Sequence, residues 1–566
     1  MPPLSPEVSI TQSIQQRSLP EVPAELDSDD PYNRQAQTFP VLDAEKVARI
    51  ASFGEEERLA DGALLFERGE RSVDFFLVLD GAVEIFEGGD DGEPHVVHIH
   101  HANQFTGELD LFNDRQILVS GRARGPTRVV RVPRAKFREM IAAETDIGEI
   151  IMRAFILRRV GLIKHGQGGV TLVGSGTGGD TVRIQRFLAR NGYPVRLVDS
   201  EHDEDVGGFL EGFGLAAKDL PVVVADGVPL RNPSDHELAD VLGISIALDS
   251  ERTYQLAVVG AGPAGLAAAV YAASEGLDTV ILESTAPGGQ AGTSSKIENY
   301  LGFPTGISGQ ALAGRAQNQA QKFGAELAVS RAVTGVDCGD RPFVLRLEDG
   351  QEVRAQAIVA ATGAGYRKLD LPDYHRFEGQ GIHYAATAIE ANVCGRTEVA
   401  VVGGGNSAGQ AAVFLSRHVD HVHILVRGEG LAATMSSYLI ERIEASPQIT
   451  LHPFTEVTAL HGAERLEAIS WTNRRTGASE RVPVANLFVM IGAVPNSGWL
   501  QDCVTLDERG FVATGGNALS PYMSSREGIF AVGDVRSGSV KRVASGVGEG
   551  SVVVQAIHKY LEGVSP

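Results

Sequence analysis

Three glycine-rich segments of the chain have the spacing that cradles the phosphates of a dinucleotide. Each fits a strand, then Gly-x-Gly-x-x-Gly/Ala, then a helix, and they begin at Gly174, Gly260 and Gly403. In this pattern the first glycine makes a tight turn, the second lets the backbone approach a pyrophosphate, and the third lets the helix pack on the strand. The positive end of the helix then faces the negative charge. The chain therefore carries three candidate nucleotide sites.

The loop that begins at Gly260 is the most complete of the three. The strand that follows its helix ends at Glu283, the position at which an acid holds a ribose hydroxyl. The strand that follows the Gly403 loop ends instead at Arg427, in "HILVRG". An arginine there pairs with a 2′-phosphate, so this segment favours NADPH, with NADH kept as an alternative.

The loop that begins at Gly174 has the features of a different fold. Only about 80 residues separate it from the next loop, too few for a full dinucleotide domain. Downstream, Pro221 leads an apolar strand in "DLPVVVADG". Residues 168–245 thus resemble a glutaredoxin/thioredoxin-like domain, in which that proline is usually cis. Because "SGTG" replaces the family's two cysteines, the resemblance implies a redox-inert docking module, and a nucleotide site is the alternative.

From about residue 254 the chain resembles low-molecular-weight thioredoxin reductases. The motifs that carry the resemblance occur in order: GAGPAGL (260–266), PGGQ (287–290), IENYLGFP (297–304), VAATGA (359–364), GGGNSAG (403–409), FVMIGAVPN (488–496) and GIFAVGDVRSGSVKRVASGVGEG (528–550). The resemblance implies two doubly wound α/β domains. An NAD(P)H-binding domain at 368–492 would interrupt an FAD domain formed by 254–367 and 493–566.

The resemblance also assigns residues to the two cofactors. For FAD they are Gly260, Gly262, Ala264, Gly265, Glu283, Gln290, Asn299, Thr362, Gly363, Gly533, Asp534, Arg542 and Val543, and for NADPH or NADH they are Gly403, Gly405, Asn406, Ser407, Ala408 and Arg427. The assignment of Asp534 to the cofactor also has a reason that does not depend on the resemblance. The strand "IFAV" ends in Gly-Asp and so presents an acceptor at the carboxyl edge of a sheet, where cofactor hydroxyls lie.

The segment "YAATAIE" departs from the thioredoxin reductases at their C-A-T-C motif. Ala385 and Ala388 stand where the two thiols would be, and alanine cannot attack a disulfide. The nearest cysteine is Cys394, and a lone cysteine before a buried strand is more often a packed apolar side chain. His383 and Glu390 flank the site, as proton donors or, as we favour, as structural hydrogen-bonding groups. We therefore assign no catalytic residue.

The predicted activity is transfer of hydride from NAD(P)H to FAD, with electrons passing to an acceptor that the sequence does not identify. Two alternatives stay open. One is a thioredoxin-disulfide reductase that uses another thiol, and the other is a non-enzymatic sensor that contains FAD. The well-formed loop at Gly403 favours an enzyme, because a sensor has less need of a hydride donor.

Residues 38–160 show short alternating strands with glycine turns, which predict a β-barrel or jelly roll. They resemble cyclic-nucleotide-binding domains, with Gly69 and Gly81 at turns and Gly107-Glu108-Leu109 opening the phosphate-binding segment. The arginine that pairs with the cyclic phosphate in that family is replaced by Leu118. We therefore expect the fold, with a cyclic nucleotide kept as a possible ligand. Residues 1–37 read as a disordered arm.

Composition narrows the class of protein. Acidic residues outnumber basic ones by 72 to 50, a net charge of −22, which excludes a basic nucleic-acid-binding face. The three cysteines, Cys338, Cys394 and Cys503, are far apart in sequence, so we expect no disulfide scaffold, no metal site and a reducing cytoplasm. No apolar run is long enough to span a membrane. The predicted fold is thus multidomain α/β with an N-terminal β-barrel, and we expect a homodimer.

Overall fold

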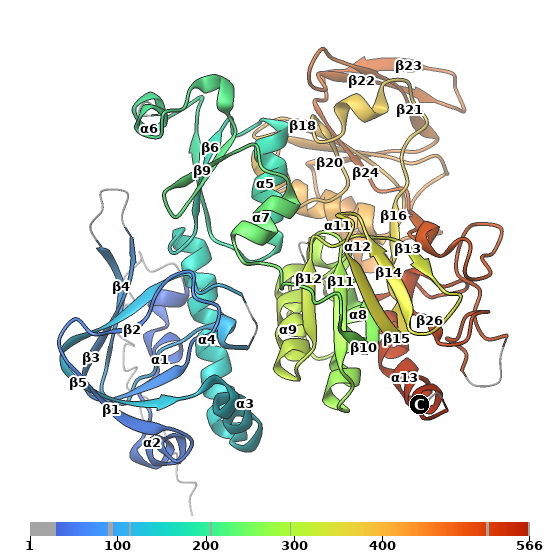
Figure 1. Ribbon diagram of the computed structural model, residues 1–566. Coiled ribbons are helices and arrows are strands. Elements are labelled where there is room, and N and C mark those ends of the chain that lie inside the picture. Colours follow the sequence, from blue (N-terminus) through green and yellow to red (C-terminus); the bar gives the residue numbers. More distant parts are fainter. Residues whose placement is uncertain are drawn as a thin grey trace, which may run out of the picture.

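The expected segments fold around separate sheets in the computed structural model (Figure 1). The structure describes residues 30–88, 94–112, 115–203, 206–294, 296–516 and 520–563. Most of the expected disordered arm, residues 1–29, lies outside the described residues. The chain is ordered before the boundary we placed at residue 38, because Pro31–Asn33 (η1) and Gln35–Thr38 (α1) are helical and Tyr32 stacks on His165 at 4.9 Å.

The N-terminal domain is an antiparallel sheet covered by a long helix. Its strands pair in the order β1-β5-β3-β4, with β2 on β5, and this described path is open, so closure into a barrel stays a prediction. The elements are α2 (Ala44–Ala51), β1 (Glu55–Leu59), β2 (Leu64–Phe66), β3 (Phe75–Gly88), β4 (Pro94–His101), η2 (Leu109–Phe112), β5 (Ser120–Val132), α3 (Arg134–Ala143) and α4 (Thr145–His165). Alternate apolar residues of β3 and β5 face the helices and form the core.

The next module combines a parallel and an antiparallel pair of strands. Strand β6 pairs in parallel with β7 and antiparallel with β8, giving the order β7-β6-β8-β9. Its elements are β6 (Val170–Gly174), α5 (Gly179–Arg190), β7 (Val195–Asp199), α6 (Val206–Gly212), η3 (Ala217–Asp219), β8 (Val222–Ala225), β9 (Val228–Arg231) and α7 (Asp235–Val241). The Leu220–Pro221 bond is cis, as expected. The likeness to thioredoxin stays a prediction.

A seven-stranded sheet organises the two outer segments of the remaining chain. Its order is β12-β11-β10-β15-β14-β13, with β26 on β15. The elements are β10 (Thr253–Val259), α8 (Pro263–Ser274), β11 (Thr279–Glu283), η4 (Ala291–Thr293), α9 (Gly309–Lys322), β12 (Glu326–Val329), β13 (Val333–Asp337), β14 (Phe343–Leu347), β15 (Glu352–Ala360), η6 (Gly498–Leu500), β26 (Ile529–Ala531), η7 (Gly533–Val535) and α13 (Val543–Glu562). The central strands are apolar and buried, as in parallel sheets covered on both faces.

A second parallel sheet lies between those segments in sequence, with the order β17-β24-β18-β19-β20. Its elements are η5 (Tyr374–Phe377), β17 (Ile382–His383), α10 (Ala388–Cys394), β18 (Glu398–Val402), α11 (Asn406–Leu415), β19 (His421–Leu425), α12 (Ser437–Glu444), β20 (Ile449–His452) and β24 (Asn486–Val489), with a side sheet of β21 (Thr455–His461), β22 (Ala468–Asn473) and β23 (Ser479–Val482). Two antiparallel strands, β16 (Ala364–Tyr366) and β25 (Ala493–Pro495), pair where the chain enters and leaves this domain.

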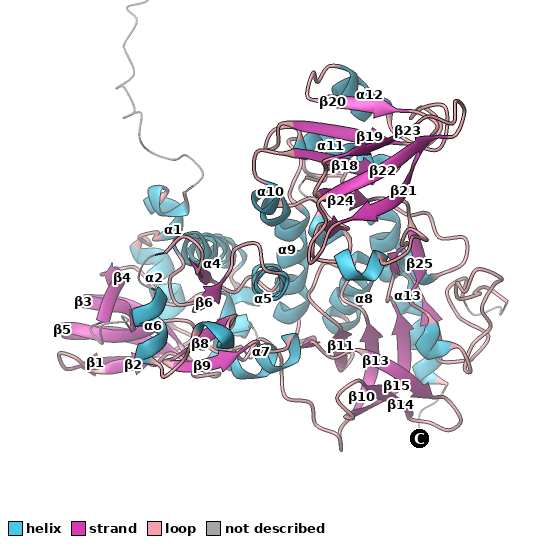
Figure 2. Ribbon diagram, turned by 90° about the horizontal axis from the view of Figure 1, so that it is seen from above, coloured by secondary structure: helices cyan, strands magenta, loops and turns pink. Residues whose placement is uncertain are grey.

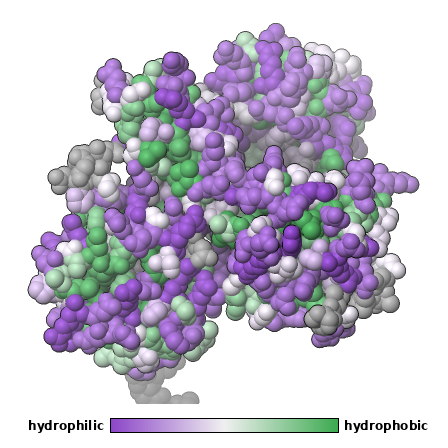
Figure 3. Space-filling view, in the orientation of Figure 1, coloured by the Kyte–Doolittle hydropathy of each residue, from purple (hydrophilic) through white to green (hydrophobic). Residues whose placement is uncertain are grey.

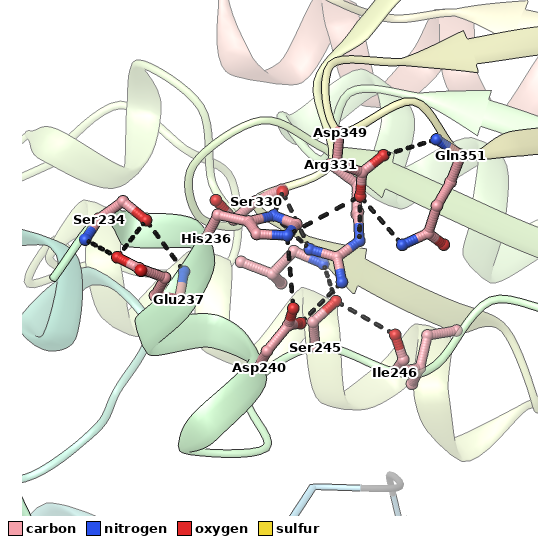
Figure 4. Close-up of polar contacts among 11 residues, drawn as sticks. Ser234, His236, Glu237, Asp240, Ser245, Ile246, Ser330, Arg331, Asp349 and Gln351 are labelled. Carbon is pink, nitrogen blue, oxygen red and sulfur yellow. Dashed lines mark hydrogen bonds and ion pairs between the residues drawn. The ribbon is translucent and has the colours of Figure 1, made fainter. Parts of the chain in front are cut away.

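The module of residues 168–245 is docked on the seven-stranded domain through α7 (Figure 4). Arg331, whose side chain is 4% exposed, donates from Nη2 to Asp240 at 2.7 Å and lies beside His236 and Asp349. The amide of Val329 donates to Ser245 Oγ at 3.1 Å. Because the arginine is buried and paired across the boundary, this contact fixes the module on the sheet edge at β12.

Seen from above, the N-terminal sheet and the module lie on one side of the molecule and the two parallel-sheet domains on the other (Figure 2). The face shown in Figure 3 is largely hydrophilic over the parallel-sheet domains, while apolar side chains gather over the N-terminal domain and the module. No helix in the described ranges combines the length and apolar character needed to cross a bilayer.

Candidate functional site

The first of the two better loops joins β10 to α8 at the carboxyl edge of the seven-stranded sheet. Gly260 has φ +103°, and a Cβ there would lie 2.5 Å from the carbonyl oxygen of Ala361, so no other residue fits without a shift. Glu283, at the end of β11, accepts hydrogen bonds from the amides of Ala261 at 2.7 Å and Thr285 at 2.9 Å. The acid expected at the ribose thus lies directly against the loop.

Two more expected segments meet this loop. Gly288 donates its amide to Ala261 O at 2.7 Å, which places the 287–290 segment over the turn. Gln290 donates its side-chain amide to Ala364 O and so joins the 362–364 segment. Thr362 Oγ1 donates to the carbonyl of Asn496 at 2.6 Å, and Asn496 Nδ2 returns a bond to Thr362 O at 2.9 Å. Asn299 is exposed in a loop, with no side-chain hydrogen bond to another described residue.

The C-terminal segment completes the same edge. Gly533 follows β26 and donates its amide to Glu549 Oε2 at 2.7 Å. Asp534 is half-buried, and burial raises the pKa of its carboxyl above the usual value, with Lys541 opposing the shift. Arg542 and Val543 lie where α13 begins, and α13 packs along α8. The structure therefore brings six separate segments of the sequence to one sheet edge.

The second loop joins β18 to α11 in the other parallel sheet. Gly403 has φ +143°, and a Cβ there would collide with the carbonyl oxygen of Met490. A Cβ at Gly405 would meet nothing within 4 Å, so this side of the turn is open. Asn406 Oδ1 accepts the amide of Ser436 at 2.7 Å, which ties the loop to the start of α12. The remaining loop residues are the exposed Ser407 and the buried Ala408.

Arg427 follows β19 and is exposed. Its guanidinium makes no ion pair or hydrogen bond with another residue that the structure describes, so it is open to a ligand. Thr434 Oγ1 donates to Gly404 O at 2.7 Å and holds the neighbouring loop. The open turn at Gly405 and the exposed Arg427 leave room for a nucleotide phosphate at the N-terminus of α11.

The segment of residues 385–388, which the resemblance aligns with the family's dithiol, leads into α10. Ala385 is half-buried and Ala388 is exposed, and neither side chain carries a sulfur atom. Cys394 is 3% exposed, and burial raises the pKa of its thiol to about 12. Because the thiolate is the reactive form, Cys394 is inert at neutral pH.

The two polar residues that flank the segment have structural partners. His383 shares a hydrogen bond of 3.0 Å with Asn486, and burial lowers the pKa of its ring, so it is neutral. Glu390 accepts the amide of Thr387 at 3.0 Å and pairs with Arg186 of α5 at 2.8 Å. Both contacts agree with the structural role that we favoured.

The structure corrects one prediction made from the cysteines. Cys338 and Cys503, which we expected to be unpaired, form a disulfide with a Cα–Cα distance of 6.1 Å. They are 165 residues apart in sequence, but β13, the edge strand of the seven-stranded sheet, lies beside η6. The pairing also removes the argument from cysteine usage for a reducing compartment.

Sequence reasoning missed two residues that order the first loop. Asn496 ends the quoted motif FVMIGAVPN and Glu549 lies in the final motif, so both were visible but had no assigned role. Glu549 holds Gly533 and also pairs with Arg536. A lone acid in the apolar, glycine-rich segment VASGVGEGSVVV is the signal that would have found it.

In the N-terminal domain the expected phosphate-binding segment is already engaged. Glu108, which would meet a ribose hydroxyl, is buried and accepts a hydrogen bond from Nε of Arg159, a residue of α4, at 2.6 Å. Leu118, at the position of the family's arginine, is 2% exposed. The acid for a cyclic nucleotide is thus occupied and the cation is absent from its expected position.

Comparison with known proteins agrees with this division. Residues 254–550 match the family described as "Pyridine nucleotide-disulphide oxidoreductase", and residues 56–144 match "Cyclic nucleotide-binding domain". The chain is 34% identical over 313 residues to the thioredoxin reductase of Treponema pallidum (strain Nichols), a match that covers 55% of this chain and 98% of that protein. It is also 34% identical over 349 residues to NADPH-dependent thioredoxin reductase 3 of Arabidopsis thaliana, covering 59% of this chain and 65% of that protein.

Solved structures give the same fold for the second half. The thioredoxin reductase of Lactococcus lactis superposes with a TM-score of 0.51 at 28% identity, covering 55% of this chain and 99% of that one. The thioredoxin reductase of T. acidophilum gives the same score and identity, covering 56% of this chain and all of that one.

Proposed function

The chain belongs to the pyridine nucleotide-disulphide oxidoreductase family, and from this we propose that it oxidises NADPH and passes the electrons through FAD to an acceptor other than an internal thioredoxin-type dithiol. The thioredoxin reductase-like half would carry the reaction, and the cyclic-nucleotide-binding-like domain would regulate it. NADH is the alternative donor. The acceptor is outside the chain in this proposal.

The residues at both loops fit the groups that the family uses. At the first loop, a Cβ on Gly262 would meet only Gly289 Cα, at 4.0 Å, which leaves room for a pyrophosphate against the α8 N-terminus. Glu283 lies at the ribose position and Asp534 offers an acceptor half-buried at the sheet edge. At the second loop, Gly405 and Arg427 provide the open turn and a cation. When bound, FAD supplies the hydride and electron-transfer chemistry.

The observation that carries the proposal is the pair of alanines at 385 and 388. The family's dithiol positions hold no sulfur, and the nearest cysteine is a buried thiol with a raised pKa. A thiolate is needed to attack a disulfide, so these residues cannot relay electrons to one. Without a dithiol, the electrons would pass directly from the reduced FAD to an acceptor.

An anaerobic titration of the purified FAD-loaded protein with NADPH tests the proposal. We expect about one equivalent of NADPH to bleach the flavin absorbance, because NADPH and FAD each carry two electrons. About two equivalents would show a second two-electron centre and contradict the proposal. No bleaching with NADPH or NADH would show that the chain does not use a pyridine nucleotide and would favour a sensor.

The Cys338–Cys503 disulfide supports a second candidate, a disulfide reductase that uses this pair. Both cysteines are half-buried, and the turn that carries Cys503 follows Asn496, a residue bonded to the 362–363 segment. This candidate predicts two equivalents of NADPH in the titration. The variant Cys338→Ser/Cys503→Ser would then return to one equivalent, whereas Cys394→Ser would not.

The double variant Ala385→Cys/Ala388→Cys tests whether the segment lies within reach of the flavin. In the family the two thiols at these positions exchange electrons with FAD, so an installed disulfide takes up two electrons and two protons. We expect the NADPH requirement to rise from about one to about two equivalents per FAD. The single variant Ala385→Cys, which cannot form this disulfide, is the control and stays at one. A double variant that also stays at one would place the segment away from the flavin.

Arg427→Ala tests the choice of NADPH over NADH. Removing a charge-assisted hydrogen bond to the 2′-phosphate costs about 1.5–3 kcal/mol, so KM for NADPH rises about tenfold or more while KM for NADH is unchanged. The readout is steady-state reduction of an artificial acceptor with each nucleotide. Arg417→Ala is the control, because Arg417 is exposed beyond the far end of α11. If KM rose equally for NADPH and NADH, Arg427 would not be the residue that binds the 2′-phosphate.

A further inference from the structure

The N-terminal domain contains a cavity between its sheet and α4. Its volume is about 60 Å³, several times the 10–15 Å³ that one water needs. The walls are apolar and include Phe66, Ile85, Val97, Ile117, Val119 and Leu162. Three basic side chains, Arg158, His98 and His100, also line it, and none of them has a role in the reaction proposed above.

Arg158 is a buried cation whose described partners are neutral. Its side chain is 6% exposed, and it donates from Nε to Thr38 O at 2.9 Å and from Nη1 to Gly107 O at 2.8 Å. Its Nη2 is buried and has no hydrogen-bond partner in the described part of the domain. Three aromatic rings, including Phe105 at 4.8 Å, surround the guanidinium. Burial lowers the pKa of Arg158 to about 9.

The carboxylates that line the cavity do not neutralise this cation. Arg159 holds Glu108 and also donates to Asp110 at 2.5 Å. Asp74 accepts from Arg131 at 2.6 Å. Since buried charges are normally paired, Arg158 is left with a position for an anion that the described chain does not supply.

Two imidazoles line the same cavity as Arg158. His98 Nε2 and His100 Nδ1 are buried and have no hydrogen-bond partner among the described residues. Burial, with Arg158 close by, lowers the pKa of His98 to about 4 and that of His100 well below its ordinary value, so both rings are neutral near pH 7. A neutral imidazole can donate one N–H to an anion without adding charge.

We propose that this cavity binds a small organic monocarboxylate, with the carboxylate on Arg158, His98 and His100 and an apolar body against the sheet. A single negative charge matches the one unpaired cation, and the apolar walls disfavour a phosphate, whose higher charge would need more donors. The site differs from that of a cyclic nucleotide, because Glu108 is committed to Arg159 and Leu118 replaces the phosphate-binding arginine.

Calorimetry on the full-length FAD-loaded protein tests the site with butyrate, valerate and benzoate as probes. We expect at least one of these carboxylates to bind, and to bind at least tenfold more tightly than its neutral amide, because the charge-assisted bonds are lost in the amide. Equal binding of acid and amide, or no binding of any of the three, would overturn the proposal. If cyclic AMP competed with the carboxylate, the cavity would be a nucleotide-binding site and the proposal would be wrong.

Three variants separate the site from the fold. Arg158→Met removes the cation and should abolish the difference between acid and amide. Val119→Phe keeps Arg158 but fills the cavity, so it should also lose carboxylate binding. It provides the test if Arg158→Met fails to fold. Arg153→Met, on the exposed face of α4, should bind like the wild type. Retention of carboxylate binding in Val119→Phe would place the ligand elsewhere.

Discussion

Gly403→Ala will still bind FAD but will lose the reduction of FAD by NADPH. At φ +143° an alanine is strained, and its Cβ would collide with Met490 O and approach Ala408 Cβ to 3.3 Å. The Met490 carbonyl is backbone that follows β24, so the loop itself must move. Because this turn sets the distance between the backbone and the nucleotide phosphates, we expect the rate of flavin reduction to fall on the order of 100-fold, about 2.7 kcal/mol.

Rapid mixing of the variant with NADPH under anaerobic conditions measures that rate directly. The FAD content should match the wild type, since the segments that we propose to bind FAD belong to the other sheet. Gly430→Ala is the matched control, because Gly430 lies in the same domain and a Cβ there would meet nothing within 4 Å. Wild-type rates in Gly403→Ala would mean that this loop is not the NADPH site.

The parts of the molecule that sequence reasoning recovered are local. A turn such as the one at Gly260 is specified by a few consecutive residues, and the strand that ends at Glu283 and the helix that begins at Pro263 follow from the same stretch. The resemblance then placed distant motifs, including Thr362 and Gly533, at one sheet edge, where the structure has them. Pro221 was likewise readable from its position before an apolar strand.

The parts that could not be recovered depend on contacts between distant segments. Nothing near Cys338 indicates that Cys503 lies beside it, because the pairing depends on how β13 and η6 are folded together. The sequence also gave no sign that Glu108 would be used by an arginine of the following helix. Periodicity identifies a buried face, but it does not specify which polar group will meet which partner.

Arg186→Ala will loosen the module of residues 168–245 from the domain of residues 368–492. Glu390 is 2% exposed, and its Oε1 accepts a hydrogen bond from Arg186 Nε at 3.0 Å and forms an ion pair with Nη2 at 2.8 Å. Without the arginine, the buried carboxylate keeps Thr387 as its one donor among the described residues. Breaking a fully buried pair costs about 3–5 kcal/mol, and because Arg186 is partly exposed we expect about 1–3 kcal/mol here.

Hydrogen exchange of the α5 amides measures this loosening, with faster exchange expected in the variant. Arg183→Ala is the control on the same helix, because Arg183 pairs with Asp235 inside the module and not across the boundary. Unchanged exchange in Arg186→Ala would show that the Arg186–Glu390 pair does not hold the module in place.

Adding Glu390→Gln to Arg186→Ala distinguishes a charge effect from a packing effect. A neutral amide in the same place no longer needs a cation, so the double variant should recover much of the lost stability if the cost came from an unpaired buried charge. Asn191, which follows α5, also donates from Nδ2 to Thr285 O at 3.2 Å, two residues after Glu283, so this helix contacts both parallel-sheet domains. If these contacts restrain their relative motion, flavin reduction by NADPH will change in Arg186→Ala and return in the double variant, while Arg183→Ala reacts like the wild type.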